Sequence, residues 1–151
     1  MILLPADIRY ALRANAINSA AAQAQEKPFD PRSEARDSLR PVVKYFNPLG
    51  AGTWLATELY EDGDTLFGLA DLGFGCPEMG VFSLNEIEAV RLPYGMRIER
   101  DTGFYSLHSL SRWAETARRA GSIIHAEQLL RHAAPDAAPD LPSDPAQGTA
   151  G

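Results

Sequence analysis

Carboxylates are the side chains of this sequence whose density most favours chemistry. Residues 45–96 hold one base, Arg91, against eight acids, so this segment has a net charge of −7. The eight acids are Glu58, Glu61, Asp62, Asp64, Asp71, Glu78, Glu86 and Glu88. Converging carboxylate oxygens can bind a hard divalent cation, whereas carboxylates spread over a surface attract a positively charged partner.

The tetrad Glu61-Asp62-Gly63-Asp64 predicts the tip of a β-hairpin. Asp-Gly is a strong signal for a tight turn, and the alternating runs Thr53–Tyr60 and Thr65–Ala70 predict the two strands. One interpretation of the acids is a solvated strand face. The other is a surface that binds a basic protein, or that imitates nucleic-acid phosphates to occupy a nucleic-acid-binding protein. The predicted contacts are Glu58, Glu61, Asp62 and Asp64, with Trp54 and Tyr60 as aromatic anchors.

The string Arg97-Ile98-Glu99-Arg100-Asp101 alternates in charge. On a strand, Arg97, Glu99 and Asp101 would share one face. This arrangement gives either an internal ladder of salt bridges or a small polar pocket. The pocket would be formed by Glu86, Arg97, Glu99, Asp101 and Tyr105.

An enzyme is the second hypothesis. A metal-dependent hydrolase would use Glu58 or Glu78 together with Glu86 near a metal ion, but strand acids that point outward do not converge. The lone Cys76 has no histidine within thirty residues, which favours an incidental loop cysteine over a nucleophile. His125 and His132 would lie about 10 Å apart along a helix, too far to share one ion. The sequence therefore favours a protein that is not an enzyme, and it predicts no metal and no cofactor.

A DNA-binding regulator is the third hypothesis. Two predicted helices meet at Ala120-Gly121, beside Arg118 and Arg119, as in a helix-turn-helix. The second helix offers no Arg, Lys or Asn between Ser122 and Gln128, so a plain helical hairpin is favoured. The pair Gly73-x-Gly75 lacks the other residues of a phosphate-binding loop and is interpreted as a turn.

The elements that would position these residues define an α+β fold. A helix is expected over Leu4–Gln25, a loop over 26–40, and a small, mainly antiparallel sheet from Pro41 to Phe82 with a further strand near Ile98. Within the strand Thr53–Tyr60, Leu55 and Leu59 are expected on one core face. Ser83 and Glu86 have the spacing of a capping box, which predicts a short helix from Leu84. A helical hairpin, Leu110–Ala120 and Ser122–Ala133, would close a single domain over residues 1–133. The Pro-, Ala- and Asp-rich residues 134–151 are expected to be disordered.

Length and composition set the class of protein. The chain has 151 residues, one cysteine and a net charge of −6. One cysteine cannot build a disulfide framework, and no apolar run is long enough for a membrane span, which predicts a cytoplasmic protein. The net negative charge makes nucleic acid an unlikely partner. The sequence predicts no oligomeric state.

Several segments are similar to a known bacterial family. The motifs are Leu3-Leu4-Pro5, Lys44-Tyr45-Phe46, Thr53-Trp54 with Thr57-Glu58, Leu66-Phe67-Gly68-Leu69, the run from Gly80 to Glu88, and Ile98-Glu99-Arg100-Asp101. Over roughly residues 1–108 the chain resembles the domain of unknown function 2958. The stretch from Ala14 to Arg36 and the residues after Ser109 depart from the family pattern. The resemblance implies a small α+β protein often encoded on plasmids, conjugative elements and phages, with no assigned activity.

These observations favour an accessory protein of a mobile genetic element. It would act by binding a protein partner with a basic surface through the acidic hairpin. The carboxylate hydrolase and the DNA-binding regulator are the alternatives.

Overall fold

The computed structural model describes residues 1–25, 36 and 38–135. Most of the predicted loop over 26–40, and the predicted disordered tail after Pro135, lie outside the described residues. The helices are α1 (Ala6–Gln25), α3 (Leu84–Ala89), the short 3-10 helix η1 (Pro93–Gly95), α4 (Leu110–Ala120) and α5 (Ile123–Leu130). The strands are β1 (Val43–Phe46), β2 (Thr53–Leu59), β3 (Thr65–Asp71), β4 (Glu78–Ser83) and β5 (Glu99–Arg100).

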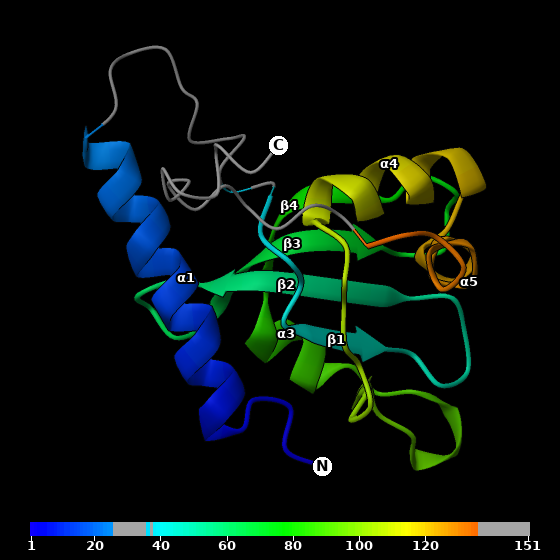
Figure 1. Ribbon diagram of the computed structural model, residues 1–151. Helices are drawn as coiled ribbons and strands as arrows, with labels where there is room; N and C mark the ends of the chain where they lie inside the picture. Colours follow the sequence, from blue (N-terminus) through cyan, green and yellow to red (C-terminus); the bar gives the residue numbers. More distant parts are fainter. Residues whose placement is uncertain (26–35, 37, 136–151) are drawn as a thin grey trace.

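The strands form one five-stranded antiparallel sheet in the order β4-β3-β2-β1-β5 (Figure 1). Consecutive strands from β1 to β4 are neighbours, as hairpin connections require. The predicted α+β class, with an N-terminal helix, a small antiparallel sheet and C-terminal helices, is confirmed. The strand expected near Ile98 is reduced to the two residues of β5. No helix in the described part of the chain is both long and apolar enough to cross a membrane.

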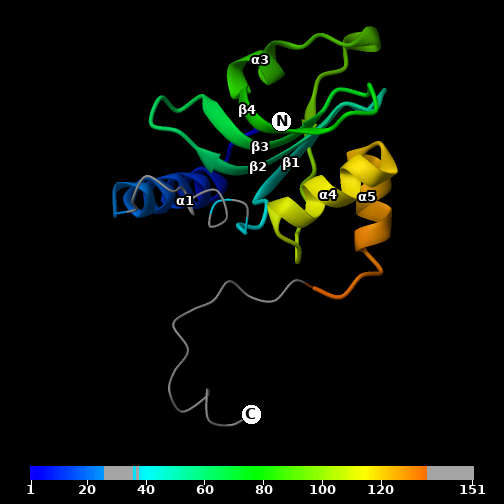
Figure 2. The same ribbon diagram turned by 90° about the horizontal axis from the view of Figure 1, so that it is seen from above.

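Each face of the sheet has its own apolar core. Figure 2 shows α3 on one side of the sheet and α4 with α5 on the other. The first core packs Leu84 and Ile87 of α3, together with Leu12 of α1, against the sheet. The second core packs Trp113 of α4 and Ile123 of α5 against the opposite face. Helices therefore cover both faces of the sheet, although Glu78 and Val81 of the edge strand β4 stay exposed.

A β-bulge in β2 moves side chains from one face to the other. The pairing of β2 with β3 shifts register between Ala56 and Glu58, which inserts one extra residue. Leu55 consequently packs in the core beneath α4 and α5, whereas Leu59 packs in the core beneath α3. The prediction that Leu55 and Leu59 share a face is wrong, because a side-chain period of two does not continue through a bulge.

Two of the predicted helix ends are present in the structure, whereas the last helix, predicted to reach Ala133, ends at Leu130. Ser83 Oγ accepts a hydrogen bond from the Glu86 N–H at 3.1 Å, which caps α3. Gly121 ends α4 with a φ of 83°, in the left-handed region that glycine adopts without strain. The buried Asp71 carboxylate accepts hydrogen bonds from the Gly73 N–H at 2.8 Å and the Ile123 N–H at 2.9 Å. Asp71 thus fixes the start of α5 to the end of β3.

Candidate functional site

Glu58 lies inside the protein rather than on the acidic hairpin surface predicted for it. The residue is fully buried, and its carboxylate accepts hydrogen bonds from Arg36 Nε at 2.9 Å and Arg36 Nη2 at 3.4 Å. Arg36 also donates to the Tyr60 hydroxyl at 3.2 Å and lies over the Phe67 ring, 4.3 Å from its centroid. The prediction that Glu58 is an exposed binding residue is wrong, since the bulge turns it toward the second core.

The Arg36–Glu58 pair is a buried ion pair. The Arg36 side chain is 16% exposed and that of Glu58 only 1%. Burial lowers the pKa of Arg36, but its hydrogen bonds and electrostatic attraction to Glu58 and, to a smaller extent, Tyr60 together raise it by more, so the pKa is raised overall. A hollow of about 550 Å³ lies beside the pair, bordered by Ala16 and Ile17 of α1 among others. Because each charge is already satisfied by the other, the pair holds β2 in place and offers no free acid.

The hairpin acids Asp62 and Asp64 accept hydrogen bonds from other groups of the same chain. Asp62 Oδ1 accepts from the N–H groups of Asp64 at 2.9 Å and Thr65 at 2.8 Å, while Oδ2 accepts from the Thr65 hydroxyl at 2.6 Å. The Asp64 carboxylate accepts from the Ser83 hydroxyl at 2.8 Å and from the Asn85 N–H at 2.7 Å. Asp64 therefore joins the hairpin to the N-terminus of α3, where a negative charge is favourable.

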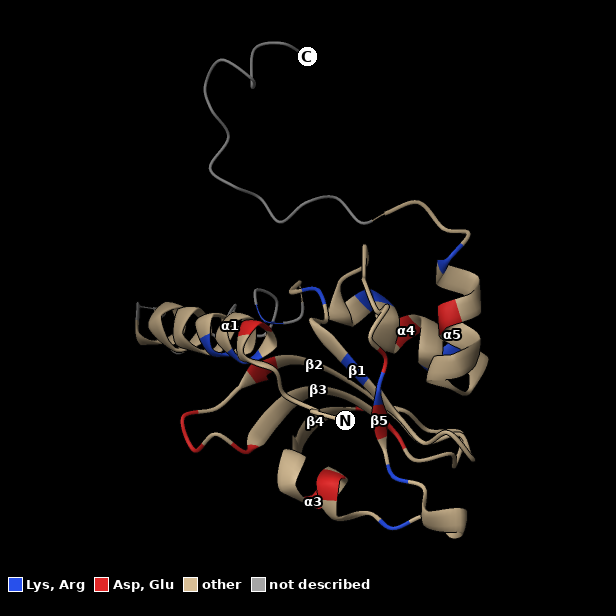
Figure 3. Cartoon of the chain, turned by 90° about the horizontal axis from the view of Figure 1, so that it is seen from below, with Lys and Arg blue, Asp and Glu red and all other residues tan. Residues whose placement is uncertain are grey.

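The hairpin tip also has positive neighbours. Arg13 of α1 donates to the Leu59 carbonyl at 2.6 Å, and the Arg9 guanidinium lies beside Gly63. Glu61 is exposed, whereas the proposed anchors Trp54 and Tyr60 are only partly exposed and pack against the two cores. Figure 3 shows the acids of the hairpin loop and, separately, those of α3. The hairpin is thus a mixed surface rather than a purely negative one.

The hydrogen bonds of Asp62 predict a measurable pKa change. Hydrogen bonds from the Thr65 side chain, the Thr65 N–H and the Asp64 N–H lower the Asp62 pKa below its ordinary value of 3.8. Since the folded pKa lies below the unfolded one, these bonds favour folding above the ordinary aspartate range, and the benefit is lost as pH falls through the lowered pKa. We expect Thr65→Val to raise the midpoint of the Asp62 carboxyl resonance in an NMR titration. An unchanged midpoint would contradict this assignment.

The residues predicted to form one polar pocket are divided among different parts of the surface. Asp101 and Tyr105 border a hollow of about 350 Å³. Arg97 and Glu99 border another hollow, which Glu88 also lines. Glu86 lies apart from these residues, exposed on α3. The structure thus brings together pairs of the predicted residues but not the set of five.

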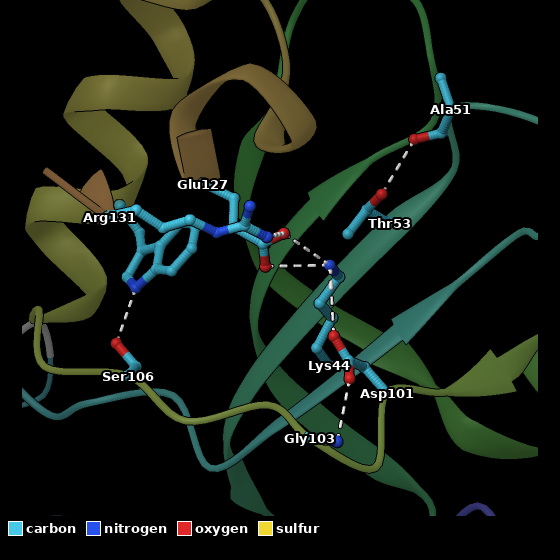
Figure 4. A network of polar contacts seen from close by, with 9 residues as sticks. Lys44, Ala51, Thr53, Asp101, Gly103, Ser106, Glu127 and Arg131 are labelled. Carbon is cyan, nitrogen blue, oxygen red and sulfur yellow. Dashed lines mark hydrogen bonds and ion pairs between the residues drawn. The ribbon is translucent and has the colours of Figure 1, made fainter. Parts of the chain in front are cut away.

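The polar centre near Asp101 uses residues that the sequence did not single out. Lys44 of β1 is buried, and its ammonium group lies 2.9 Å from Glu127 Oε2 of α5 and 3.6 Å from Asp101 Oδ2 (Figure 4). Arg131 contacts the other oxygen of Glu127 at 3.1 Å. Glu127 is separated from Lys44 by 83 residues, so nothing local in the sequence predicts the pair. The network ties α5 and the segment after β5 to the sheet.

Ser106 and His108, on the same hollow, are not arranged for nucleophilic catalysis. Ser106 Oγ accepts from Trp113 Nε1 at 2.8 Å and donates to the His108 carbonyl at 2.9 Å. The His108 ring instead lies 2.9 Å from the Leu130 carbonyl. A serine nucleophile requires its base within hydrogen-bond reach of Oγ, and the ring contacts a different group. This hollow is therefore lined by aromatic side chains and by the Glu127 ion network, which hold the structure together.

The carboxylates considered for a hydrolase do not converge. Glu58 is buried with Arg36, Glu78 lies on the edge strand β4, and Glu86 lies on α3. Among the described residues, no group of three or more His, Cys, Asp or Glu side chains is placed to hold a metal ion. The lone Cys76 is an exposed free thiol. These positions give no support for the hydrolase alternative.

One exposed charged surface is the outer side of β4 and the start of α3, which we term the acidic edge. It comprises the exposed residues Glu78 and Val81 of β4 and Glu86 of α3, together with the intermediate strand residues between Glu78 and α3. Both glutamates are exposed, and neither forms an ion pair with another described residue. Glu61 and Glu88 are exposed as well, so the acidic edge is one of the places where the negative charge of residues 45–96 is available to a partner.

The fold and this surface define a small α+β protein, with a five-stranded antiparallel sheet covered by helices on both faces and one open edge. The family described as "Protein of unknown function (DUF2958)" matches residues 3–124, and the chain belongs to this family. The match extends past Ser109 through α4 into α5, so α4 lies inside the family region rather than in an added extension. No curated protein and no solved structure matches the chain.

Proposed function

We propose that this chain is an accessory protein of a mobile genetic element that acts by binding a protein with a basic surface. The resemblance to a family often encoded on plasmids, conjugative elements and phages supports the genetic context. The observation that supports the binding proposal is which acids of residues 45–96 form internal contacts and which remain exposed. Glu58, Asp64 and Asp71 form internal contacts, whereas Glu78 and Glu86 remain exposed at the acidic edge.

Charge complementarity favours this class of partner. Exposed like charges raise the local concentration of an oppositely charged protein and select against partners of the same sign. Arg91, the one base of the segment, donates to the Glu88 and Ala89 carbonyls at the far end of α3. No described base, Arg91 included, forms an ion pair with Glu78 or Glu86. The surface proposed from the sequence accordingly moves from the hairpin tip to the acidic edge.

Affinity capture with matched charge variants tests the proposal. The double variant Glu78→Lys/Glu86→Lys reverses the acidic edge, whereas Glu61→Lys reverses one exposed acid at the hairpin. We expect a bacterial protein captured by the unchanged chain to be lost with the double variant and retained with Glu61→Lys. Retention by both variants, or loss only with Glu61→Lys, would reject the acidic edge as the binding surface.

A further inference from the structure

The outer side of β4 presents unpaired backbone groups. Leu84 N–H donates to the Asp64 carbonyl directly opposite it, so alternate β4 residues back to Glu78 pair with β3. The N–H and C=O groups of Met79 and Val81 therefore point away from β3. No hydrogen bond from another described residue reaches them. A strand edge in this state can accept a further strand.

The two edge strands of the sheet, β5 and β4, differ in length and in how far other residues cover them. The opposite edge, β5, has only two residues, and Met1 and Ile2 cover it, with Arg100 Nε donating to the Ile2 carbonyl at 3.1 Å. β4 has six residues, and it contains no Lys, Arg or Pro and no bulge. Proteins normally protect an exposed edge by one of these devices, because an open edge pairs with other chains. The one charged residue of β4, Glu78, lies at its first position, so the rest of the strand carries none of these devices and is open for pairing.

Side chains along β4 indicate what kind of strand would fit. Val81, near the centre of β4, is 60% exposed, and a Cβ built on Gly80 would meet open space. Glu78 lies at one end of the strand and Glu86 follows the other end. An extended segment with β-branched residues at its middle and Lys or Arg toward its ends would place apolar groups beside Val81 and cations beside both glutamates.

A second copy of the chain fits this edge less well. Antiparallel pairing of two β4 strands would bring the Glu78 end of each copy against the α3 end of the other, where Glu86 and Asp64 lie. Like charges placed opposite each other on a sheet are destabilising. The net charge of −6 adds further repulsion between copies. Charge thus favours a basic segment over self-pairing.

We infer that the acidic edge binds an extended, basic segment of a partner protein as a sixth strand added to β4. This inference rests on the proposed function and specifies its binding mode. Backbone hydrogen bonds to Met79 and Val81 supply affinity that does not depend on side chains. The glutamates select basic partners. The probe for the test is a set of synthetic peptides enriched from a displayed library of random twelve-residue sequences, selected on the full chain.

Val81→Pro is the decisive variant. It removes an N–H that points away from β3, a position at which edge strands tolerate proline, and its ring blocks an incoming strand. We expect enriched peptides to be basic and alternating, and to bind this variant about tenfold more weakly or worse, as the loss of a hydrogen bond and a steric clash require. Amide hydrogen exchange at Met79 and Val81 of the unchanged chain should slow when peptide binds. Val81→Lys, which keeps the backbone and repels a basic peptide, replaces the proline variant if that variant does not fold.

The outcomes separate this inference from the proposed function. If Glu78→Lys/Glu86→Lys abolishes peptide binding while Val81→Pro and Val81→Lys leave it intact, binding at the acidic edge stands and strand addition is wrong. If no basic peptide is enriched, strand addition is wrong, and the affinity capture decides the proposed function. Light scattering of the free chain tests the other occupant: a dimer that becomes a monomer in Val81→Pro would show that a second copy occupies β4 and would overturn the inference.

Discussion

Gly68→Ala is expected to lower the free energy of unfolding by about 3 kcal/mol or more, enough to unfold a marginally stable domain. A Cβ on residue 68 would lie 1.8 Å from the Leu55 carbonyl oxygen, 2.8 Å from its carbon and 2.9 Å from Ala56 Cα. All three are backbone atoms of β2, so no side chain can move aside. The clash could be relieved only by separating β2 from β3.

The cross-strand neighbour of Gly68 supplies a matched control. Gly80 of β4 pairs directly with Gly68, yet a Cβ at that position meets nothing within 4 Å. We expect Gly80→Ala to change the free energy of unfolding by about 0.5 kcal/mol or less. Urea denaturation followed by circular dichroism measures both values. Equal losses for the two variants would show that the close approach of β2 at Gly68 is not the cause.

Local chemistry predicted most of the secondary structure. Ser83 begins α3 through a capping hydrogen bond, and Gly121 ends α4 through its backbone angles; both depend on a few adjacent residues. The Asp62-Gly63 turn is likewise a local feature, and β2 pairs with β3 as expected. These predictions succeeded because no distant part of the chain is needed to produce them.

The bulge could not be predicted in the same way. It depends on the absence of a side chain at Gly68, which allows the backbone of Leu55 and Ala56 to approach from the neighbouring strand. A glycine within a strand can indicate a bulge or a close approach, but the sequence does not say which partner it faces. Missing the bulge placed Glu58 on the wrong face, so the predicted acidic surface included a buried residue.

The candidate site shows the same limit: the sequence gives the charge of a residue but not its position in the fold. The sequence identifies an acidic segment, but the base that neutralises its residue Glu58 is Arg36, which lies outside the segment. Acids outside the segment are paired across long distances as well, because Lys44 contacts Glu127 and Asp101. Counting charges along the chain cannot separate an acid that caps a helix, such as Asp64, from one that remains exposed, such as Glu86. Only the three-dimensional positions separate the buried acids Glu58 and Asp71 from the exposed ones, two of which lie at the acidic edge.

The Arg36–Glu58 pair is expected to show strong coupling between its two residues. Arg36→Met would leave the Glu58 carboxylate, 1% exposed, without its cation, and should cost about 3 to 5 kcal/mol of unfolding free energy. Glu58→Leu should cost somewhat less, because the guanidinium it leaves behind is 16% exposed and still donates to Tyr60. The double variant Arg36→Met/Glu58→Leu removes both charges and fills the site with apolar atoms. We expect it to lie within about 1.5 kcal/mol of the unchanged chain, as exchanges of buried ion pairs for apolar residues commonly do.

A double-mutant cycle measured by urea denaturation tests this expectation. The coupling free energy should be about 2 kcal/mol or more, since the second substitution removes the unpaired charge created by the first. Arg119→Met and Glu115→Leu on α4 provide the control, because that pair also lies within hydrogen-bond distance but its side chains are 79% and 63% exposed. An exposed helix pair should show coupling of about 0.5 kcal/mol or less. Additive losses at Arg36 and Glu58 would mean that the two charges are solvated independently.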